Sequence, residues 1–182
     1  FQDAEVKRGK RIGKGNFADA YLAEIVSGGR GVVMKVPKDQ RAVEECKKEM
    51  SSIMNVAGQK NIIRFEGVYI NARGSQCFLV EHCGLGSLDK LHHKFDLLDD
   101  SKFWPIAKGL LFALDHLHRH GILHRDVACR NLLITEKWEV KLSDFGLTVR
   151  APNGVYDTQP GENLPWAWMP VESLKNRRLP YA

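Results

Sequence analysis

The order of hydrophobic and polar residues divides the chain into a strand-rich first part and a helix-rich second part. Residues 11–25, RIGKGNFADAYLAEI, alternate as two strands around a glycine turn, and residues 31–36, GVVMKV, have the pattern of a third strand. Residues 41–57 have a helical period that ends at the following glycine, and two more strands are predicted within 61–70 and 77–83. The buried stripe of this helix is predicted to contain Val43, Cys46, Met50, Ile53, Met54 and Ala57.

The second part has longer helical periods. Ser87 is predicted to cap a short helix, and residues 101–120 are predicted to form a longer one. Pro105 would lie in the first turn of the longer helix, and Gly121 would follow its end. The buried stripe of this helix is predicted to contain Phe103, Ile106, Leu110, Ala113, Leu114 and Leu117.

Two short apolar runs follow the long helix, LLIT at 132–135 and VKLS at 140–143, and a turn at 136–138 joins them. From there to about Pro165 the chain is rich in proline, glycine and asparagine, and it is predicted to be one long loop of a functional kind. The sequence therefore predicts an α+β protein with two lobes. The first lobe would be β-rich with one helix, the second mostly helical, and residues 81–86 would join them.

Composition and charge exclude several classes of protein. The 182 residues are 43% hydrophobic and 27% charged, as in ordinary globular proteins, and no apolar run approaches the ~20 residues that span a bilayer. The net charge of +5 comes from scattered basic pairs, so nucleic-acid binding and membrane contact are not expected. Cys46, Cys77, Cys83 and Cys129 lack metal-ligand spacing, and we expect free thiols in a reducing compartment.

Lys35 and the glycine turn before it predict an anion site. Gly13 and Gly15 lie between strands, where backbone amides can approach an anion closely, although plain hairpins also have this pattern. Lys35 stands between apolar strand residues, so its ammonium needs an anionic partner. Glu49 borders the apolar stripe of the following helix, and we expect an ion pair with Lys35 that holds the ammonium ready for a phosphate.

The run HRDVACRN, residues 124–131, places polar groups directly before a buried strand. A hairpin returns the chain to its starting point, so Asp144 is expected to meet Asn131 across a gap that fits a cation. One carboxylate and one amide oxygen suit Mg²⁺, which keeps its bonds to substrate phosphates. Asp126 would stand clear of the metal and accept a proton from a hydroxyl group, so the run predicts a site for phosphoryl transfer.

Together these motifs resemble the signature set of eukaryotic protein kinases, because GKGNF, VVMK, HRDVACRN and DFG occur in the order found in that family. The resemblance runs from Ile12 to about Leu174 and implies a protein kinase fold with ATP and Mg²⁺ as cofactors. The implied division is a kinase domain over residues 1–182, with an N-lobe at 1–80, a hinge at 81–86, a truncated C-lobe at 87–182 and an activation segment at 144–172.

The resemblance also implies a role for each site residue. The catalytic residues would be Lys35, Glu49, Asp126, Arg130, Asn131 and Asp144, of which Asn131 and Asp144 would hold the metal. The ATP-binding residues would be Ile12, Gly13, Lys14, Gly15, Asn16, Phe17, Ala20, Val33, Lys35, Val80, Glu81, Cys83 and Leu133. Val80 would be the gatekeeper, Leu133 would form the floor of the adenine site, and the backbone of Glu81 and Cys83 would bond the ring.

The catalytic loop resembles that of tyrosine kinases in particular. Ala128 stands where serine/threonine kinases usually carry a lysine, and Arg130 follows Asp126 as in the tyrosine-kinase loop DLAARN. Pro165 and Trp166 would form an apolar platform for a tyrosine ring. The resemblance implies a cytoplasmic signalling kinase, either cytosolic or part of a receptor, that phosphorylates tyrosine in protein substrates. Serine/threonine or dual specificity is the alternative.

Tyr156 is the only tyrosine between the DFG motif and Glu172, and its position resembles an activating autophosphorylation site. A phosphate there could pair with Arg125 or Arg150 and order the loop. The resemblance also implies that the longer parent protein could form a dimer in which one copy phosphorylates the other. An exposed loop tyrosine with no role is the alternative.

Three features depart from the kinase pattern. The third glycine of the phosphate loop is Ala18, PVE stands where APE is usual, and kinases continue for several helices beyond this point. We therefore expect the chain to belong to a longer protein and to be unstable or inactive alone, with the stripe at Leu110, Leu114 and Leu117 partly uncovered. A pseudokinase scaffold that binds ATP without transferring phosphate is the alternative from another class of function.

Overall fold

Two units, each with its own core, make up the chain. The first contains Phe1–Ala57 and Ile63–His82, and the second contains Gly58–Ile62 and Cys83–Ala182. The short segment Gly58–Ile62 therefore packs with the second unit although it follows the helix of the first. The computed structural model describes residues 5–71, 74–91, 94–96, 99–159, 161–162, 164–169, 171–176 and 178–180.

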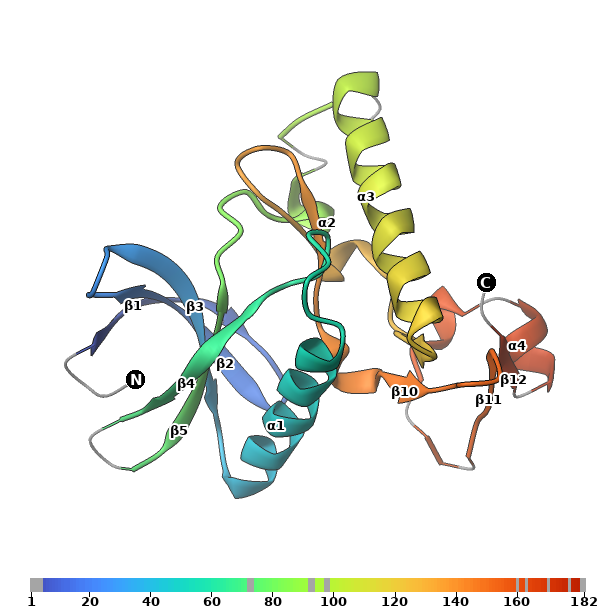
Figure 1. Cartoon of the computed structure of the whole chain (residues 1–182), viewed down its shortest axis with the longest axis horizontal. Helices are drawn as coiled ribbons and strands as arrows, with labels where there is room; N and C mark the ends of the chain where they lie inside the picture. Colours follow the sequence, from blue (N-terminus) through green and yellow to red (C-terminus); the bar gives the residue numbers. More distant parts are fainter. Residues whose placement is uncertain are drawn as a thin grey trace. The chain divides into compact units, whose positions relative to one another are not determined.

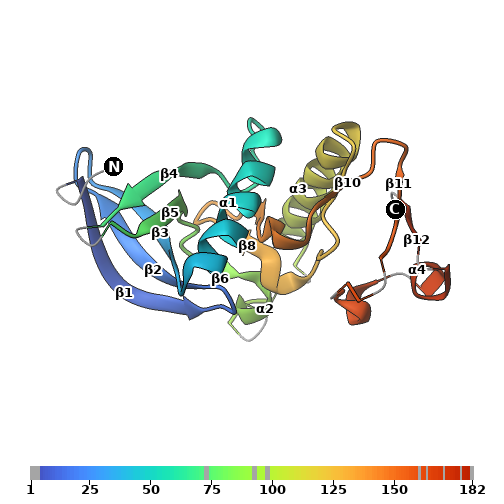
Figure 2. The ribbon, with the colours of Figure 1, turned by 90° about the horizontal axis from the view of Figure 1, so that it is seen from below.

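The strand patterns of the first unit form one antiparallel sheet in the order β1-β2-β3-β5-β4 (Figure 1). The strands are β1 (Val6–Lys14), β2 (Ala18–Ile25), β3 (Arg30–Pro37), β4 (Phe65–Ile70) and β5 (Gln76–Glu81). Register shifts interrupt the β1–β2 pairing on both sides of Arg11, and the two strands curve strongly along their length (Figure 2).

Successive side chains of these strands point to opposite faces of the sheet, so one face forms the core and the other carries polar residues. The core face contains Val6, Ala23, Ile25, Val32, Met34, Tyr69, Cys77 and Leu79, all buried. The opposite face carries Lys35, which pairs with Ala20 on β2 and with Phe78 on β5. Val33 pairs with Val80 on the same face. The alternation therefore places these predicted nucleotide-binding residues together on one side of the sheet.

Helix α1 (Gln40–Asn55) begins at Asp39, whose carboxylate accepts a hydrogen bond of 2.7 Å from the Ala42 N–H. The helix contacts β3, β4 and β5. The predicted stripe was wrong at its edges, because Val43 is only half-buried, Met54 is 53% exposed and Ala57 lies beyond the helix end. The buried residues are Ala42, Cys46, Glu49, Met50 and Ile53.

The second unit consists of short strands and three-residue turns around one long helix, α3 (Asp100–Arg119) (Figure 1). The other helices are α2 (Leu88–Leu91) and α4 (Val171–Asn176), with single 3₁₀ turns at Cys129–Asn131, Phe145–Leu147 and Trp166–Trp168. The strands are β6 (Gly86–Ser87), β7 (Ile122–Leu123), β8 (Leu132–Ile134), β9 (Val140–Leu142), β10 (Val149–Arg150), β11 (Val155–Asp157) and β12 (Arg178–Pro180).

Helix α3 packs its apolar stripe on β7 and β9. Ile106, Ala113 and Leu117 are buried there, and Val140 and Leu142 on β9 are fully buried. Asn61 joins this core, because its side-chain amide donates to the Val140 carbonyl at 2.9 Å and its backbone carbonyl accepts from the Leu142 N–H at 2.8 Å. The core of the second unit therefore fixes the β8–β9 hairpin that precedes the DFG motif.

Several predictions for α3 were wrong in detail. Phe103 is 43% exposed and lies outside the stripe. Leu110 and Leu114 are half-buried, which agrees with the expectation that they are partly uncovered. Leu117, which we expected to be partly uncovered, is fully buried, and the most exposed apolar residue of the helix is Leu111. The helix begins at Asp100, one residue earlier than predicted, which moves Pro105 into the second turn.

The segment predicted to be one long loop contains two short strands. β10 pairs with β7, and β11 pairs with β12. Each strand is two or three residues long and pairs with a segment distant in sequence, so no local alternation marks it.

All four cysteines are free thiols, as predicted: Cys46, Cys77 and Cys83 are buried, and Cys129 is exposed. Among the described residues, no helix has the length and hydropathy needed to cross a membrane.

Gly109 on α3 should not tolerate a methyl group, although alanine is the better helix former. A Cβ atom at this position would lie 2.6 Å from Cγ1 of Val140 and 2.7 Å from Nδ2 of Asn61. Overpacking costs about 1–3 kcal/mol and exceeds the ~1 kcal/mol gained in helix propensity. We expect Gly109→Ala to lower the free energy of unfolding by roughly 1 kcal/mol in urea denaturation. The exposed neighbour Lys108→Ala is the control, and equal or higher stability of Gly109→Ala would contradict this packing.

Candidate active site

The predicted ion pair between Lys35 and Glu49 is present in the first unit. The ammonium nitrogen lies 2.5 Å from Oε1 of Glu49, and the Glu49 side chain is only 10% exposed. The helical period explains the contact, because Glu49 lies in the buried stripe of α1 that faces β3. Burial raises the pKa of the neighbouring Cys46 thiol to about 11, and the Glu49 carboxylate acts in the same direction. The thiol therefore stays neutral beside the ion pair.

The glycine turn between β1 and β2 is tied to the end of β3. The Gly15 N–H donates to the Ala18 carbonyl at 3.0 Å, and a Cβ atom on Gly15 would lie 2.8 Å from that oxygen. Ala18, which replaces a glycine of the kinase pattern, is not among the described residues with a positive φ. Nζ of Lys38 donates to the Gly15 carbonyl at 2.5 Å. The sequence analysis missed Lys38, whose only signal was a basic residue next to the end of a strand.

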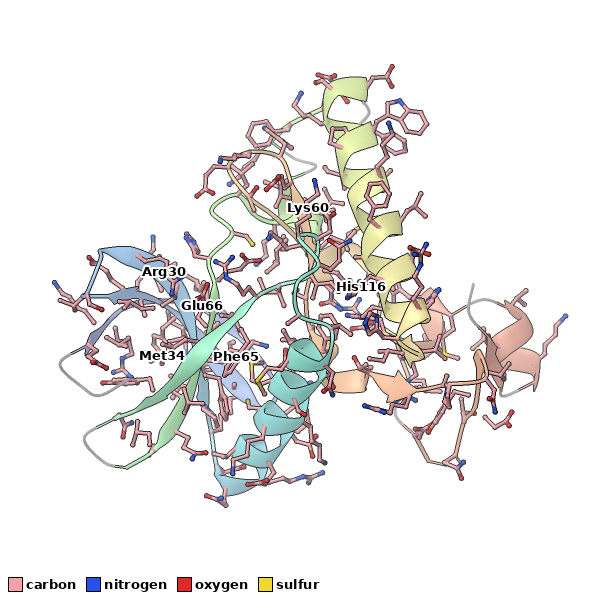
Figure 3. The ribbon with its side chains drawn as sticks, in the orientation of Figure 1. Arg30, Met34, Lys60, Phe65, Glu66 and His116 are labelled. Atoms are coloured by element: carbon pink, nitrogen blue, oxygen red, sulfur yellow. The ribbon has the colours of Figure 1, made fainter. Side chains whose placement is uncertain are left out.

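Glu81, a predicted adenine-binding residue, is held by Arg64 of the same unit. Its N–H donates to the Arg64 carbonyl at 2.9 Å, and its carboxylate accepts from the Arg64 N–H at 3.2 Å. Glu66 binds Arg30 at 2.7 Å, and these two labelled residues lie close together in Figure 3. Glu66 also binds Arg64 at 2.7 Å, and its hydrogen bond raises the pKa of Arg64. This network fixes the end of β5, and no sequence motif indicated it.

In the second unit, Asp126 is the centre of the catalytic-loop contacts. The Asn131 amide donates to Oδ2 of Asp126 at 2.7 Å and to its backbone carbonyl at 2.8 Å. Arg130 donates to Oδ1 of Asp126. Asp126 is 7% exposed and Asn131 5% exposed. Both carboxylate oxygens therefore accept hydrogen bonds, which fix the orientation of the buried group.

The β8–β9 hairpin brings the DFG motif back to Asn131, as its length predicts. The carbonyl of Asn131 accepts hydrogen bonds of 2.9 Å from both the backbone N–H and the hydroxyl of Ser143. Asp144 follows directly and has a left-handed backbone with φ of 64°, an uncommon conformation for a residue with a side chain. Asp144 is therefore the direct chain neighbour of a residue, Ser143, that contacts Asn131.

His124 is a neutral buried residue in this loop. Burial lowers the pKa of its imidazole to about 4, and the nearby Asp144 carboxylate opposes that shift. Nδ1 accepts from the Asp126 N–H at 3.3 Å, so Nε2 carries the proton and donates to the Ser143 carbonyl at 3.1 Å. Its ring contacts Phe145 edge to face, with centroids 4.9 Å apart. His124 therefore joins Asp126 to the DFG motif.

Tyr156 lies beside Arg125 and not beside Arg150, the other cation considered for it. The Arg125 guanidinium is 5.1 Å from the centre of the Tyr156 ring. The Tyr156 hydroxyl donates to Glu162 at 2.8 Å, and Arg125 donates to the same carboxylate at 3.1 Å. The tyrosine is half-buried, with its ring packed near Leu123 and Ala151. The sequence analysis did not find Glu162.

Trp168 contacts the catalytic loop, a contact that the sequence analysis did not predict. The Arg130 guanidinium stacks on the Trp168 ring at 4.2 Å, whereas Trp166 is 72% exposed. Pro165 is half-buried. The platform of Pro165 and Trp166 for a substrate ring stays a prediction.

The remaining predicted nucleotide-binding residues lie as follows. Ile12, Lys14, Asn16 and Phe17 are exposed around the glycine turn. Gly13 is half-buried opposite Ala20, and Cys83 is buried. Leu133 is half-buried on β8, opposite Ser87. Within the predicted activation segment, residues 160, 163 and 170 lie outside the described residues.

The neutral His124 predicts a loss of stability in mild acid. The unfolded chain takes up a proton on this residue below about pH 6.5, whereas the folded chain does so only near pH 4. Unfolding therefore binds a proton between these values, and folded-state stability falls as the pH falls. We expect His124 to contribute about 2 kcal/mol to the loss between pH 7 and pH 5, measured by urea denaturation. His124→Asn should be less stable at pH 7 but should lose less stability on acidification. An identical pH dependence in both proteins would contradict the assignment.

The chain is similar to several named protein kinases. It is 30% identical over 172 residues to Serine/threonine-protein kinase dst1 of Dictyostelium discoideum, a match that covers 93% of this chain and 23% of that protein. It is 32% identical over 171 residues to Serine/threonine-protein kinase KIC1 of Saccharomyces cerevisiae, covering 92% and 16%. It is 29% identical over 160 residues to human Mitogen-activated protein kinase kinase kinase 4, covering 86% and 10%. The chain thus spans less than a quarter of the length of these relatives.

The family match agrees with the geometry of both units. The sequence pattern of the family described as "Protein tyrosine and serine/threonine kinase" matches residues 6–182, nearly the whole chain. The match includes the Lys35–Glu49 ion pair in the first unit and the Asp126–Asn131 contacts in the second. This chain belongs to the protein tyrosine and serine/threonine kinase family.

Proposed function

We propose that the chain is the catalytic part of a protein kinase that transfers a phosphoryl group from ATP to a hydroxyl group of protein substrates. The observation that carries the proposal is the pair of hydrogen bonds from the Asn131 amide to Asp126. They hold a carboxylate in place as a proton acceptor while directing the amide oxygen of Asn131 away from it. A pseudokinase that only binds nucleotide would not need Asp126 held in this way.

The donor set fits Mg²⁺ that arrives with a nucleotide. Both N–H groups of the Asn131 amide are used by Asp126, so its oxygen is directed elsewhere and can serve as a ligand. Asp144 supplies a carboxylate from a distant part of the sequence, directly after Ser143, which hydrogen-bonds the Asn131 carbonyl. The described residues contain no cluster of three or more histidine, cysteine or acidic groups that could hold a metal. One amide and one carboxylate suit an ion that completes its coordination with phosphate oxygens and water.

Each unit would contribute separate chemical roles. ATP with Mg²⁺ would supply the transferable phosphoryl group. Lys35, held in place by its ion pair with Glu49, would bind phosphate oxygens through its ammonium. Gly13 and Gly15 would let backbone amides approach phosphates closely. Asp126 would orient the substrate hydroxyl and accept its proton, and Arg130 would stabilise that carboxylate.

We propose serine and threonine as the principal acceptors, because two of the relatives described above are named serine/threonine-protein kinases. The shared residues span the two units, and the transfer chemistry is the same for any hydroxyl. This revises the tyrosine specificity expected from the catalytic loop alone.

Tyrosine is a second candidate acceptor, favoured by one specific arrangement. Arg130 bridges from the Asp126 carboxylate to the face of Trp168, and Ala128 is buried with no side chain that could reach a phosphate. Arg130 in this position would leave room for a tyrosine, which is longer than serine or threonine, and would support its phenol ring. The stacked Trp168, rather than Pro165 and Trp166, would then provide the apolar surface.

We propose that the enzyme works in the cytoplasm. Its four free thiols suit a reducing compartment, which also supplies ATP and Mg²⁺. Phosphorylation of Tyr156 is part of the proposal, because the ring lies against Arg125.

Asp126→Asn tests the proposal. The amide keeps the shape of the side chain but cannot accept the substrate proton, so we expect kcat to fall by about 10²–10⁴-fold in the full-length protein with little change in ATP binding. Asp115→Asn on the exposed face of α3 removes a carboxylate of a surface ion pair and is the control. Peptide phosphorylation and nucleotide titration measure the two effects. A wild-type protein that binds ATP but labels no peptide would indicate the pseudokinase alternative.

A degenerate peptide library with a fixed serine, threonine or tyrosine acceptor would identify the substrate class. We expect the full-length enzyme to label serine and threonine peptides at least tenfold faster than tyrosine peptides, a difference of ~1.4 kcal/mol in transition-state free energy. The Asp126→Asn protein measures the background from contaminating kinases. Preferential labelling of tyrosine would overturn the serine/threonine proposal and favour the arrangement of Arg130 and Trp168.

A further inference from the structure

Arg125 is a buried cation in a strained part of the catalytic loop. Its side chain is only 9% exposed, and its backbone φ is 67°, in the left-handed region. A buried guanidinium needs an anion, because removing its partner leaves an uncompensated charge. Glu162 meets this need, with its Oε1 atom 3.1 Å from Nη1 of Arg125.

Glu162 joins three other segments through one carboxylate. Oε1 accepts hydrogen bonds from both Arg125 and the Tyr156 hydroxyl, and Oε2 accepts one of 3.0 Å from the Gln159 N–H. Burial alone would raise the pKa of Glu162, but the bonds from Tyr156, Gln159 and Arg125 outweigh it and lower the pKa. The hydrogen bond to Glu162 raises the pKa of Tyr156. The carboxylate is therefore ionised and the phenol neutral at physiological pH.

Arg125 links Glu162 to both the catalytic loop and the DFG motif of the second unit. It directly precedes Asp126, and its Nε donates to the Leu147 carbonyl at 2.5 Å, three residues after Asp144. An Arg125 without an anion would be free to turn toward water. The hydrogen bond to Leu147 would then weaken, and with it the link between the catalytic loop and the DFG motif.

We propose that Glu162 is a positioning residue that occupies the phosphate position of the activation segment, so that Arg125 is already paired in the unmodified protein. This inference rests on the proposed kinase function and concerns its regulation. The unmodified enzyme would thus have substantial activity. Phosphorylation of Tyr156 would exchange one anion for another at Arg125 and not create a new pairing.

The exchange follows from charge and distance. In the modification, the Tyr156 oxygen forms a bond to the γ-phosphorus of ATP, the bond to ADP breaks, and the phenolic proton leaves to solvent. The product carries about −1.5 to −2 charges beside a carboxylate that was its hydrogen-bond acceptor. Like charges at this separation repel, so Glu162 would leave, and the phosphate oxygens would bind Arg125 as stronger acceptors.

Glu162→Gln tests the proposal, because it removes the charge and keeps the shape. In full-length protein freed of phosphotyrosine by a phosphatase, we expect kcat to fall about tenfold, with the KM values for ATP and peptide changed less than about twofold. The matched control is Glu139→Gln, an exposed carboxylate in the β8–β9 turn, which should keep wild-type kinetics. Thermal denaturation checks that both variants are folded.

Phosphorylation of the same proteins separates positioning from general stability. After modification of Tyr156 by a tyrosine kinase, verified by mass spectrometry, Glu162→Gln should recover to within about twofold of phosphorylated wild type. Wild type itself should gain less than about threefold, since its Arg125 was already paired. If Glu162→Gln does not fold, this wild-type gain is the test, and a gain above tenfold overturns the proposal.

Other outcomes are equally decisive. Unchanged kcat in unphosphorylated Glu162→Gln, or a loss that phosphate on Tyr156 does not restore, would overturn the positioning role. A wild-type protein without any transferase activity would instead contradict the proposed function itself, since the Glu162 comparison presupposes turnover.

Discussion

The second unit depends on the hydrogen bonds of one buried residue, Asn131. Its side chain binds Asp126, its carbonyl accepts two bonds from Ser143, and its N–H donates to the Ala128 carbonyl at 2.8 Å. Each bond lies in a buried site, where an unpaired polar group would cost about 1–3 kcal/mol. The loop, the hairpin and the DFG motif therefore cannot shift independently. The left-handed backbone of Asp144 persists because these contacts determine its position on both sides.

Local pattern and spacing were enough to predict two contacts of the candidate site. The helical period placed Glu49 on the side of α1 that reaches Lys35, and the hairpin length returned Ser143 to Asn131. Lys38, Glu162 and Trp168 escaped prediction for one physical reason. Each contacts a segment distant in sequence through a single charged or aromatic group, and no periodicity marks such a contact.

In the fold, too, local sequence patterns predict some features, whereas contacts between distant segments determine others. The five-stranded sheet and the two main helices follow from alternation and from the helical period. The edges of the buried stripes could not be predicted in this way. Hydrophobicity alone favours burial of Met54 over Glu49, whereas packing buries Glu49 and leaves Met54 in solvent. The ion pair with the half-buried Lys35 ammonium decides that preference. The short strands β10 and β11 exist only because distant segments pair with them.

The choice of acceptor depends on a smaller part of the structure than the transfer itself. The roles proposed for Lys35, Asn131 and Asp144 would be the same for any hydroxyl substrate, so they do not by themselves select serine, threonine or tyrosine. The acceptor side chain would instead meet residues near Asp126. There Ala128 offers no charge, while Arg130 is fixed between a carboxylate and the Trp168 ring. A rigid cation at that place can bind a substrate of one length only, because moving it would unpair Asp126. The proposed acceptor specificity would therefore depend on the same carboxylate that the proposed transfer uses.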